Sequence, residues 1–422
     1  MRSLAFVFLS AIPLAVLDIA TPAFCEPVFS TPDMAVIFNR IAPHFTECAG
    51  SPVPGMIKGE GTYRNDGFYV GKPEMVMPTG SGTLSAMVSY GDRLELHLSK
   101  TGYYNALSDD ESGAKGAHVN PLLSPGHISI ELRNASAKQI IKFDQRIDFA
   151  RGSVIVELQT AEGSVRIEVA GDMNQDNLVI SIKDARHIGK PASIRYDNWR
   201  NSMMVKDGEG MLMGEEAADV SGIQGPKAQS VSMAIQIGCM NGEGYKTTSY
   251  KNSGSLIVPA SVLDDFTVII SAKCVHGKPP VELTAGAWKA TTSSSPKQLE
   301  KERLDWWKDF WGHSWLDISG PQADYLTRLW FTTLYSYACV GQGPVVPKFN
   351  GGPGLVFKDA RSWGDGYWWQ NQREISFWPM LTAGHPEFTR TAILFFNQAF
   401  DVCRENARHY KMDGVLFLER CV

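Results

Sequence analysis

The hydrophobic pattern of the chain changes once, and this change constrains the fold more than any other feature. From about residue 30 to 285, apolar and polar residues alternate in short runs that are separated by Gly, Asp and Asn. The clearest runs are 93–99, 127–133, 153–159, 164–170 and 178–183. Alternation with a period of two is typical of strands that bury one face. It predicts a large antiparallel β-sandwich, of the supersandwich kind, over residues 30–288.

After this region the apolar residues recur at helical spacing. Ser295 is a good N-cap, Pro296 suits the first helical position, and Gln298 stands where a capping box places an amide. The aromatic residues of 306–311 then follow at helical intervals. We therefore expect a helical linker over 289–319. Further helices are predicted at about 321–339, 367–382 and 387–408, inside a helical domain that covers 320–422.

The N-terminus and the charge restrict the compartment and the partners. Arg2 precedes an apolar run that Pro13 and Asp18 interrupt, and small residues follow, so residues 1–25 are interpreted as a signal peptide. The mature protein is then secreted or periplasmic and has no membrane association. A net charge of -5 without a basic stripe excludes a nucleic-acid partner. The oligomeric state is not predicted.

The cysteine pattern indicates neither a metal site nor a fixed disulfide framework. Seven cysteines are dispersed without metal-ligand spacing, so no metal and no cofactor is predicted. In an oxidising compartment Cys239 and Cys274 could form a bridge. Buried free thiols are equally compatible with the sequence.

The segment RSWGDGYWWQNQREISFWPML, residues 361–381, combines six aromatic residues with three amides, two arginines and two carboxylates. Burying so many polar groups without partners or a ligand costs several kcal/mol, so the segment is predicted to form a site. Glycosidic cleavage needs carboxyl groups on the two sides of the bond. Among the acidic residues of the helical part, the catalytic candidates are Asp365, Glu374 and Glu419.

The remaining polar and aromatic residues of this region suit sugar binding. Indole rings offer flat apolar surfaces to sugar C–H groups, and guanidinium groups orient hydroxyls or a uronate carboxylate. The substrate-binding candidates are Asn350, Arg361, Trp363, Trp368, Trp369, Gln370, Asn371, Gln372 and Arg373. On a helix that begins near 367, Gln370 and Glu374 share one face. The structural alternative is that the aromatic side chains are core and that Glu374 pairs with Arg373.

Three stretches resemble a known family. WWKDFWGHSWLDI (306–318), KFNGG (348–352) and the 361–381 segment resemble the junction and first barrel helices of bacterial glycoside hydrolases related to family 95, the inverting α-L-fucosidases. MPTGSGTLSAMVSYGDRLELHLSKTGYY (77–104) resembles the opening of their β-sandwich. The resemblance implies a β-sandwich, a linker and an (α/α)6 barrel, which this chain would contain in truncated form. It also implies an oligosaccharide or polysaccharide as partner.

The sequence departs from the pattern of that family at informative positions. Gly80-Ser81-Gly82 stands for Gly-Asn-Gly, and Lys100-Thr101-Gly102 for Lys-Thr-Asp. Gln370 and Gln372 occupy the positions of two asparagines that position water, so fucose specificity does not carry over. Glu419 ends a GVLFLE stretch that is similar to a Gly-x-x-Phe-Pro-Glu motif of relatives.

The resulting prediction is a glycosidase that hydrolyses with inversion once the barrel is complete. Two alternatives remain open. The first is a sugar-binding or structural fragment without catalysis. The second is a polysaccharide lyase, in which Tyr367 beside Arg373 would supply the base.

Overall fold

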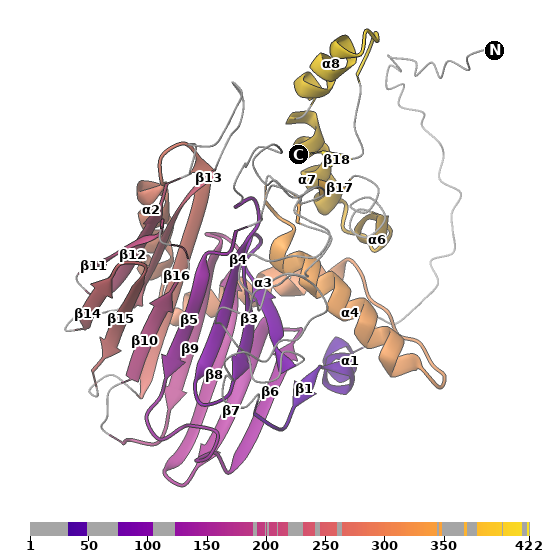
Figure 1. Cartoon of the computed structure of the whole chain (residues 1–422). Helices are drawn as coiled ribbons and strands as arrows, with labels where there is room; N and C mark the ends of the chain where they lie inside the picture. The colour runs from indigo at the N-terminus through magenta and orange to yellow at the C-terminus, as the bar shows by residue number, and fades with distance from the viewer. Residues whose placement is uncertain are drawn as a thin grey trace, which may run out of the picture.

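The computed structural model shows a two-layer β-structure with helices attached to it (Figure 1). It describes residues 33–48, 75–103, 123–188, 192–198, 200, 202–208, 210–217, 231–240, 245–259, 264–343, 346–347, 367–368, 378–398, 400–415 and 420–421. These residues form two large antiparallel sheets, one two-stranded ladder and seven helices. The predicted antiparallel sandwich is therefore confirmed.

One sheet has nine strands and the other has seven, and neighbouring strands in both are antiparallel. In spatial order the first contains β1 (His44–Phe45), β6 (Lys142–Asp148), β7 (Ser153–Thr160), β8 (Gly163–Asp172), β9 (Asn177–Asp184), β16 (Asp265–His276), β13 (Val231–Cys239), β12 (Met211–Glu216) and β11 (Met204–Gly208). The second contains β14 (Lys246–Tyr250), β15 (Ser253–Val258), β10 (Ala192–Asp197), β5 (Gly126–Glu131), β4 (Leu94–Lys100), β3 (Leu84–Tyr90) and β2 (Met77–Gly80).

The register explains why the alternating runs predict these strands. Val156, Ile167, Ile182 and Phe266 stand opposite one another across four strands of the nine-stranded sheet, and all four are buried. Their side chains point to the inner face of the sheet. Because successive side chains along a strand point to opposite faces, the residues before and after each of them line the outer face. All five runs named above overlap strands, in β4, β5, β7, β8 and β9, and the last three runs lie entirely within theirs.

Two helices lie beside the sandwich and escaped the sequence prediction. They are α1 (Met34–Ile41) and α2 (Val281–Ser293). Helix α2 packs on the outer face of the nine-stranded sheet, where Trp288 joins Val179, Ile269 and Met240 in a small apolar cluster.

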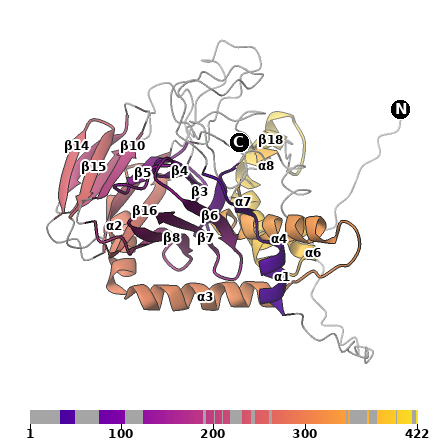
Figure 2. The ribbon, with the colours of Figure 1, turned by 90° about the horizontal axis from the view of Figure 1, so that it is seen from below.

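Helix α3 (Pro296–Gly312) begins at the predicted cap, because the hydroxyl of Ser295 accepts a hydrogen bond from the backbone N–H of Gln298 at 3.2 Å. Figure 2 shows this helix along the outer side of the sandwich. Trp307 is fully buried, and the indole N–H of Trp311 donates to the carbonyl of Phe149 at 2.7 Å. The aromatic run therefore serves as core that ties the helix to the turn between β6 and β7.

The remaining helices follow in chain order: α4 (Ala323–Val340), α6 (Trp378–Thr382), α7 (Pro386–Gln398) and α8 (Phe400–His409). The prediction at 321–339 is confirmed, whereas the range 387–408, predicted as one helix, is divided between α7 and α8. The prediction of one helix over 367–382 is wrong at its start, because β17 (Tyr367–Trp368) pairs with β18 (Arg420–Cys421). Residues 369–377 lie outside the described part of the chain.

A disulfide between Cys239 and Cys274 is excluded, because both thiols are free. In the β13–β16 register Cys239 stands opposite Val268 and Cys274 stands opposite Met233. Six residues therefore separate the two positions along the sheet, roughly 20 Å at the rise of a strand. The described helices include none that is long and apolar enough to cross a membrane.

Candidate functional site

Most of the residues predicted to form the site fall outside the described part of the chain. These are Asn350, Arg361, Trp363, Asp365, Trp369, Gln370, Asn371, Gln372, Arg373, Glu374 and Glu419. Trp368 is described through its backbone, on β17. Their roles stay predictions. The structure shows two contacts that flank this part of the chain, the β17–β18 ladder and the contact of the end of α4 with the sandwich.

The β17–β18 ladder brings together the two segments that carry the predicted carboxyl groups. Tyr367 pairs with Cys421 and Trp368 pairs with Arg420 in antiparallel register. Fifty-one residues of sequence separate the two strands, and helices α6, α7 and α8 lie between them in the chain. The aromatic segment that contains Trp368 thus meets the stretch that follows Glu419 in the sequence.

The other end of the region is fixed to the sandwich by the loop Gly80–Thr83. The backbone N–H of Gly82 donates to the carbonyl of Cys339 at 3.0 Å, and the backbone N–H of Gln342 donates to the carbonyl of Gly82 at 3.0 Å. The hydroxyl of Thr101 donates to the carbonyl of Val340 at 3.1 Å. The last turn of α4 is therefore capped by the sandwich, and the long segment after it starts from a fixed point.

The close approach accounts for the two glycines in this loop. A Cβ atom on Gly80 would stand 2.4 Å from the carbonyl oxygen of Cys339, which is backbone and cannot move aside. Gly82 adopts a φ of 108°, a conformation that side chains with a Cβ rarely adopt. Gly80 is therefore required by the contact with α4, and Gly82 by the conformation of the loop backbone.

Asp176 fixes the conformation of this loop by hydrogen bonds. Its carboxylate accepts hydrogen bonds from the hydroxyl of Ser81 at 3.1 Å and from the backbone N–H groups of Thr83 and Leu84, both at 2.9 Å. It also accepts hydrogen bonds from the hydroxyl of Thr83 and from the ammonium group of Lys100. The sandwich motifs at residues 80–82 and 100–102 are therefore parts of one assembly around a single carboxylate.

The charge of Asp176 is balanced inside this assembly. Burial disfavours the charged form, but the ammonium groups of Lys100 and Lys273 outweigh burial, and the pKa of Asp176 lies below its ordinary value. The Lys273 ammonium lies 3.5 Å from the carboxylate. Sequence analysis missed Asp176, which stands in the β8–β9 turn with a φ of 55°. An Asp in a hairpin turn is a visible signal, but its partners lie more than 70 residues away.

A cavity of about 480 Å³ lies beside Gly341–Gly343, on the helical side of the same segment. The α3 residues on its wall are Trp306, Asp309, Phe310 and His313, and α7 contributes Glu387, Phe388, Arg390, Thr391 and Leu394. Aromatic rings together with carboxylate, guanidinium and imidazole groups can bind a polyhydroxylated ligand. The structure assigns no catalytic step to this cavity.

His385 stabilises the wall of this cavity. Its ring stacks on Phe310 with a centroid distance of 4.0 Å, and its Nδ1 lies 3.0 Å from the Glu387 carboxylate. Burial lowers the pKa of His385, and the Glu387 carboxylate opposes this shift only in part. The imidazole is therefore a neutral group at neutral pH.

Comparison with solved structures finds proteins of similar fold. A putative kojibiose phosphorylase from the human microbiome matches with a TM-score of 0.56 and 12% identity, over 82% of this chain and 49% of that chain. A bacterial glucoamylase complexed with acarbose matches with a TM-score of 0.46 and 12% identity, over 85% of this chain and 54% of that chain. A family 92 inverting mannosidase from Bacteroides thetaiotaomicron matches with a TM-score of 0.36 and 11% identity, over 65% of this chain and 37% of that chain.

No protein-family model matches the chain. No curated protein matches it either. The chain spans about half the length of the first two structures. At 12% identity the likeness shows the fold alone, and the described part of the chain therefore has a fold similar to that of the putative kojibiose phosphorylase.

Proposed function

We propose that the protein cleaves a glycosidic bond in an oligosaccharide or polysaccharide, with the segment 361–374 as the core of its site. One observation carries the proposal: on a glycosidase-like fold, the β17–β18 ladder joins the two segments that contain Asp365, Glu374 and Glu419. A cleavage site needs a carboxylic acid that protonates the leaving oxygen. In the proposal one of these three residues is that acid.

The finer parts of the proposal follow the family-95 resemblance. The helical part forms the start of an (α/α)6 barrel, the reaction inverts the anomeric centre, and the base that activates water lies outside residues 361–419. The aromatic residues Trp363, Trp368 and Trp369 stack on sugar rings. The amides Gln370, Asn371 and Gln372, with Asn350, Arg361 and Arg373, bind hydroxyl or carboxylate groups.

The test compares substrates on two forms of the protein. Because the chain spans about half of the structures that it matches, both the 422-residue chain and the product of any reading frame that continues past Val422 are assayed. An oligosaccharide panel is incubated with and without inorganic phosphate. Reducing sugar indicates hydrolysis, sugar 1-phosphate indicates phosphorolysis, and an unsaturated product indicates a lyase. The proposal fails if neither form releases any product.

Variants then identify the acid. Loss of a general acid lowers the rate by about 10²–10⁴. The three variants are Asp365→Asn, Glu374→Gln and Glu419→Gln. The acid is the residue whose variant loses activity on a natural glycoside but keeps it on a dinitrophenyl glycoside, because that leaving group needs no proton. Glu131→Gln, at an exposed position on β5, is the control. NMR of the first product anomer tests inversion.

We also propose that the protein is exported and cleaved after about residue 25. The support is the Arg2 and apolar pattern of the N-terminus. Sequencing the N-terminus of protein recovered outside the cytoplasm tests this proposal, and retention of Met1 would contradict it.

A further inference from the structure

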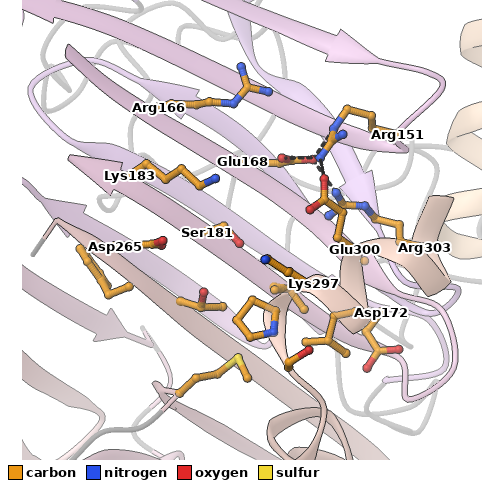
Figure 3. Close-up of a pocket in the computed structure, with 18 of the residues that line it drawn as sticks. Arg151, Arg166, Glu168, Asp172, Ser181, Lys183, Asp265, Lys297, Glu300 and Arg303 are labelled. Carbon is orange, nitrogen blue, oxygen red and sulfur yellow. Dashed lines mark hydrogen bonds and ion pairs between the residues drawn. The ribbon is translucent and has the colours of Figure 1, made fainter. Parts of the chain in front are cut away.

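A second hollow lies on the outer face of the nine-stranded sheet, on another side of the sandwich from the loop Gly80–Thr83. It has a volume of about 850 Å³ and lies between strands β8, β9 and β16 and the first half of α3. Figure 3 shows the residues on its floor and rim. We call it the α3 groove.

One end of the α3 groove is closed by an ion-pair network. Arg151 Nε lies 2.9 Å from Glu168 Oε1, and Arg303 Nη2 lies 2.6 Å from the same oxygen. Arg151 Nη2 also donates to Glu300 Oε1 at 2.5 Å. These pairs, drawn as dashed lines in Figure 3, fasten α3 to the sheet. Their charges are balanced by one another.

The other end of the groove holds cations that are not balanced in this way. Lys183 on β9 and Lys297 on α3 have no ion pair with any described carboxylate. In Figure 3 the Lys297 ammonium lies beside Ser181, and Lys183 lies on the same face of the sheet. Lys297 also stands in the first turn of α3, which contains no acidic residue. The positive end of the helix dipole adds to the potential there.

The strand register places two cationic side chains of the groove next to each other. Arg166 on β8 stands directly opposite Lys183 on β9, and like charges in such a pair repel each other. Glu157 on the far side of Arg166 pairs with it and with Arg146. Asp265 stands opposite Lys183 on β16, but the two form no ion pair. A bound anion would relieve the repulsion.

We propose that the α3 groove binds an acidic oligosaccharide, through its carboxylate or sulfate groups at Lys183 and Lys297. Ser181 and the buried Thr267 supply hydroxyl groups on the floor, and Tyr245 adds an aromatic ring. The volume falls in the range of small-ligand sites, roughly 300–1,000 Å³. Glu168, Glu300 and Asp265 in the same groove disfavour a densely charged polyanion such as nucleic acid. The choice of a saccharide among anions rests on the proposed function.

The ligands of the test form matched sets. Isothermal titration calorimetry of the full chain uses an oligogalacturonate, its methyl ester of equal length and a sulfated galactan oligosaccharide. The methyl ester removes the charge and keeps the sugar. Poly-glutamate keeps the charge and removes the sugar. We expect binding of at least one acidic saccharide, weaker at high salt, and no binding of the methyl ester or of poly-glutamate. The two acidic arms distinguish carboxylate from sulfate recognition.

The variants are Lys183→Ala with Lys297→Ala, and as control Lys138→Ala with Lys308→Ala. The control removes the same charge from two exposed lysines that do not line the groove. We expect the first pair to weaken binding at least tenfold and the control to change it less than twofold. Thermal unfolding checks that both remain folded.

The outcomes separate this inference from the proposed function. Absence of binding to both acidic saccharides, equal binding of the methyl ester or poly-glutamate, or equal loss in both double variants overturns the inference. Glycan cleavage without such binding leaves the proposed function intact. Lysine-dependent binding without any cleavage leaves the inference intact and removes the proposed function.

Discussion

The β8–β9 hairpin carries two charged groups with opposite surroundings. Asp176, in its turn, accepts hydrogen bonds from the Gly80–Thr83 loop and pairs with Lys100, whose side chain is only 5% exposed. Lys183, near the other end of the hairpin, is exposed and has no ion pair with a described residue. The same two strands thus present a satisfied charge to the helical part and an unsatisfied charge to solvent.

This difference separates structural charges from charges that are available to a ligand. A partly buried carboxylate with several donors resists both protonation and exchange of partners, because every alternative leaves the buried Lys100 ammonium unpaired. An exposed ammonium that forms no ion pair can bind an anion without breaking an existing contact. Removing Asp176 should therefore lower the stability, whereas removing Lys183 should weaken anion binding and leave the stability nearly unchanged.

The largest expected effect follows from replacing Asp176. In Asp176→Ala the buried Lys100 ammonium loses its carboxylate, and breaking a buried pair by removing one partner costs about 3–5 kcal/mol. Urea unfolding measures the loss. Asp265→Ala, which removes an exposed carboxylate from the α3 groove, is the matched control and should stay within about 0.5 kcal/mol. A loss of stability below about 1 kcal/mol for Asp176→Ala would show that Asp176 contributes no more than an exposed charge, and would contradict this comparison.

The next effect tests the backbone contact that Asp176 supports. In Gly80→Ala the added methyl group meets the carbonyl of Cys339, so the loop and α4 must separate, at about 1–3 kcal/mol for an overpacked site. Gly286→Ala is the control, because this glycine lies inside α2 with nothing within 4 Å of its Cβ position. There alanine should stabilise by about 0.5–1 kcal/mol. Equal signs for the two variants would contradict the contact.

The acid limb of the stability curve gives a smaller effect. The folded pKa of Asp176 lies below its unfolded value of about 3.9, so its contribution is complete above that pH and is lost as the pH falls through the folded pKa. A single group contributes a slope of at most about 1.4 kcal/mol per pH unit. Asp176→Asn should remove this part of the slope below pH 4. Urea unfolding between pH 2 and 6 measures the slope, and the difference between the two proteins should correspond to at most about one proton. An unchanged slope would mean that Asp176 does not take up the proton.

The sequence predicted what local patterns encode and missed what only the tertiary structure decides. Alternation located the strands, and the Ser295 cap located the start of α3. Helix α2 was missed because its buried face consists of Thr284, Ala287, Trp288 and Thr291, in which only two residues are apolar. The possible bridge between Cys239 and Cys274 failed because strand register cannot be read from spacing alone.

The candidate site shows the same limit. The motifs that contain Ser81 and Lys100 were recognised as a pattern, but the common partner of these two side chains, Asp176, lies in another hairpin. The aromatic run at 306–311 was recognised as a signature, and the structure shows that Trp307, Phe310 and Trp311 are core. Polar density marked residues 361–374, and whether those side chains converge depends on packing that a single sequence does not specify.

The smallest expected effect completes the comparison, because it is a change in stability close to zero. Removing Lys183 and Lys297 together deletes two exposed charges that hold no described partner and relieves the repulsion between Lys183 and Arg166. The free energy of unfolding should change by no more than about 0.5 kcal/mol, and a gain is the expected direction. Urea unfolding at low and high salt measures it, and the gain should shrink as salt screens the repulsion. A salt-dependent loss would show that these lysines are paired in solution, and the contrast with Asp176 would then disappear.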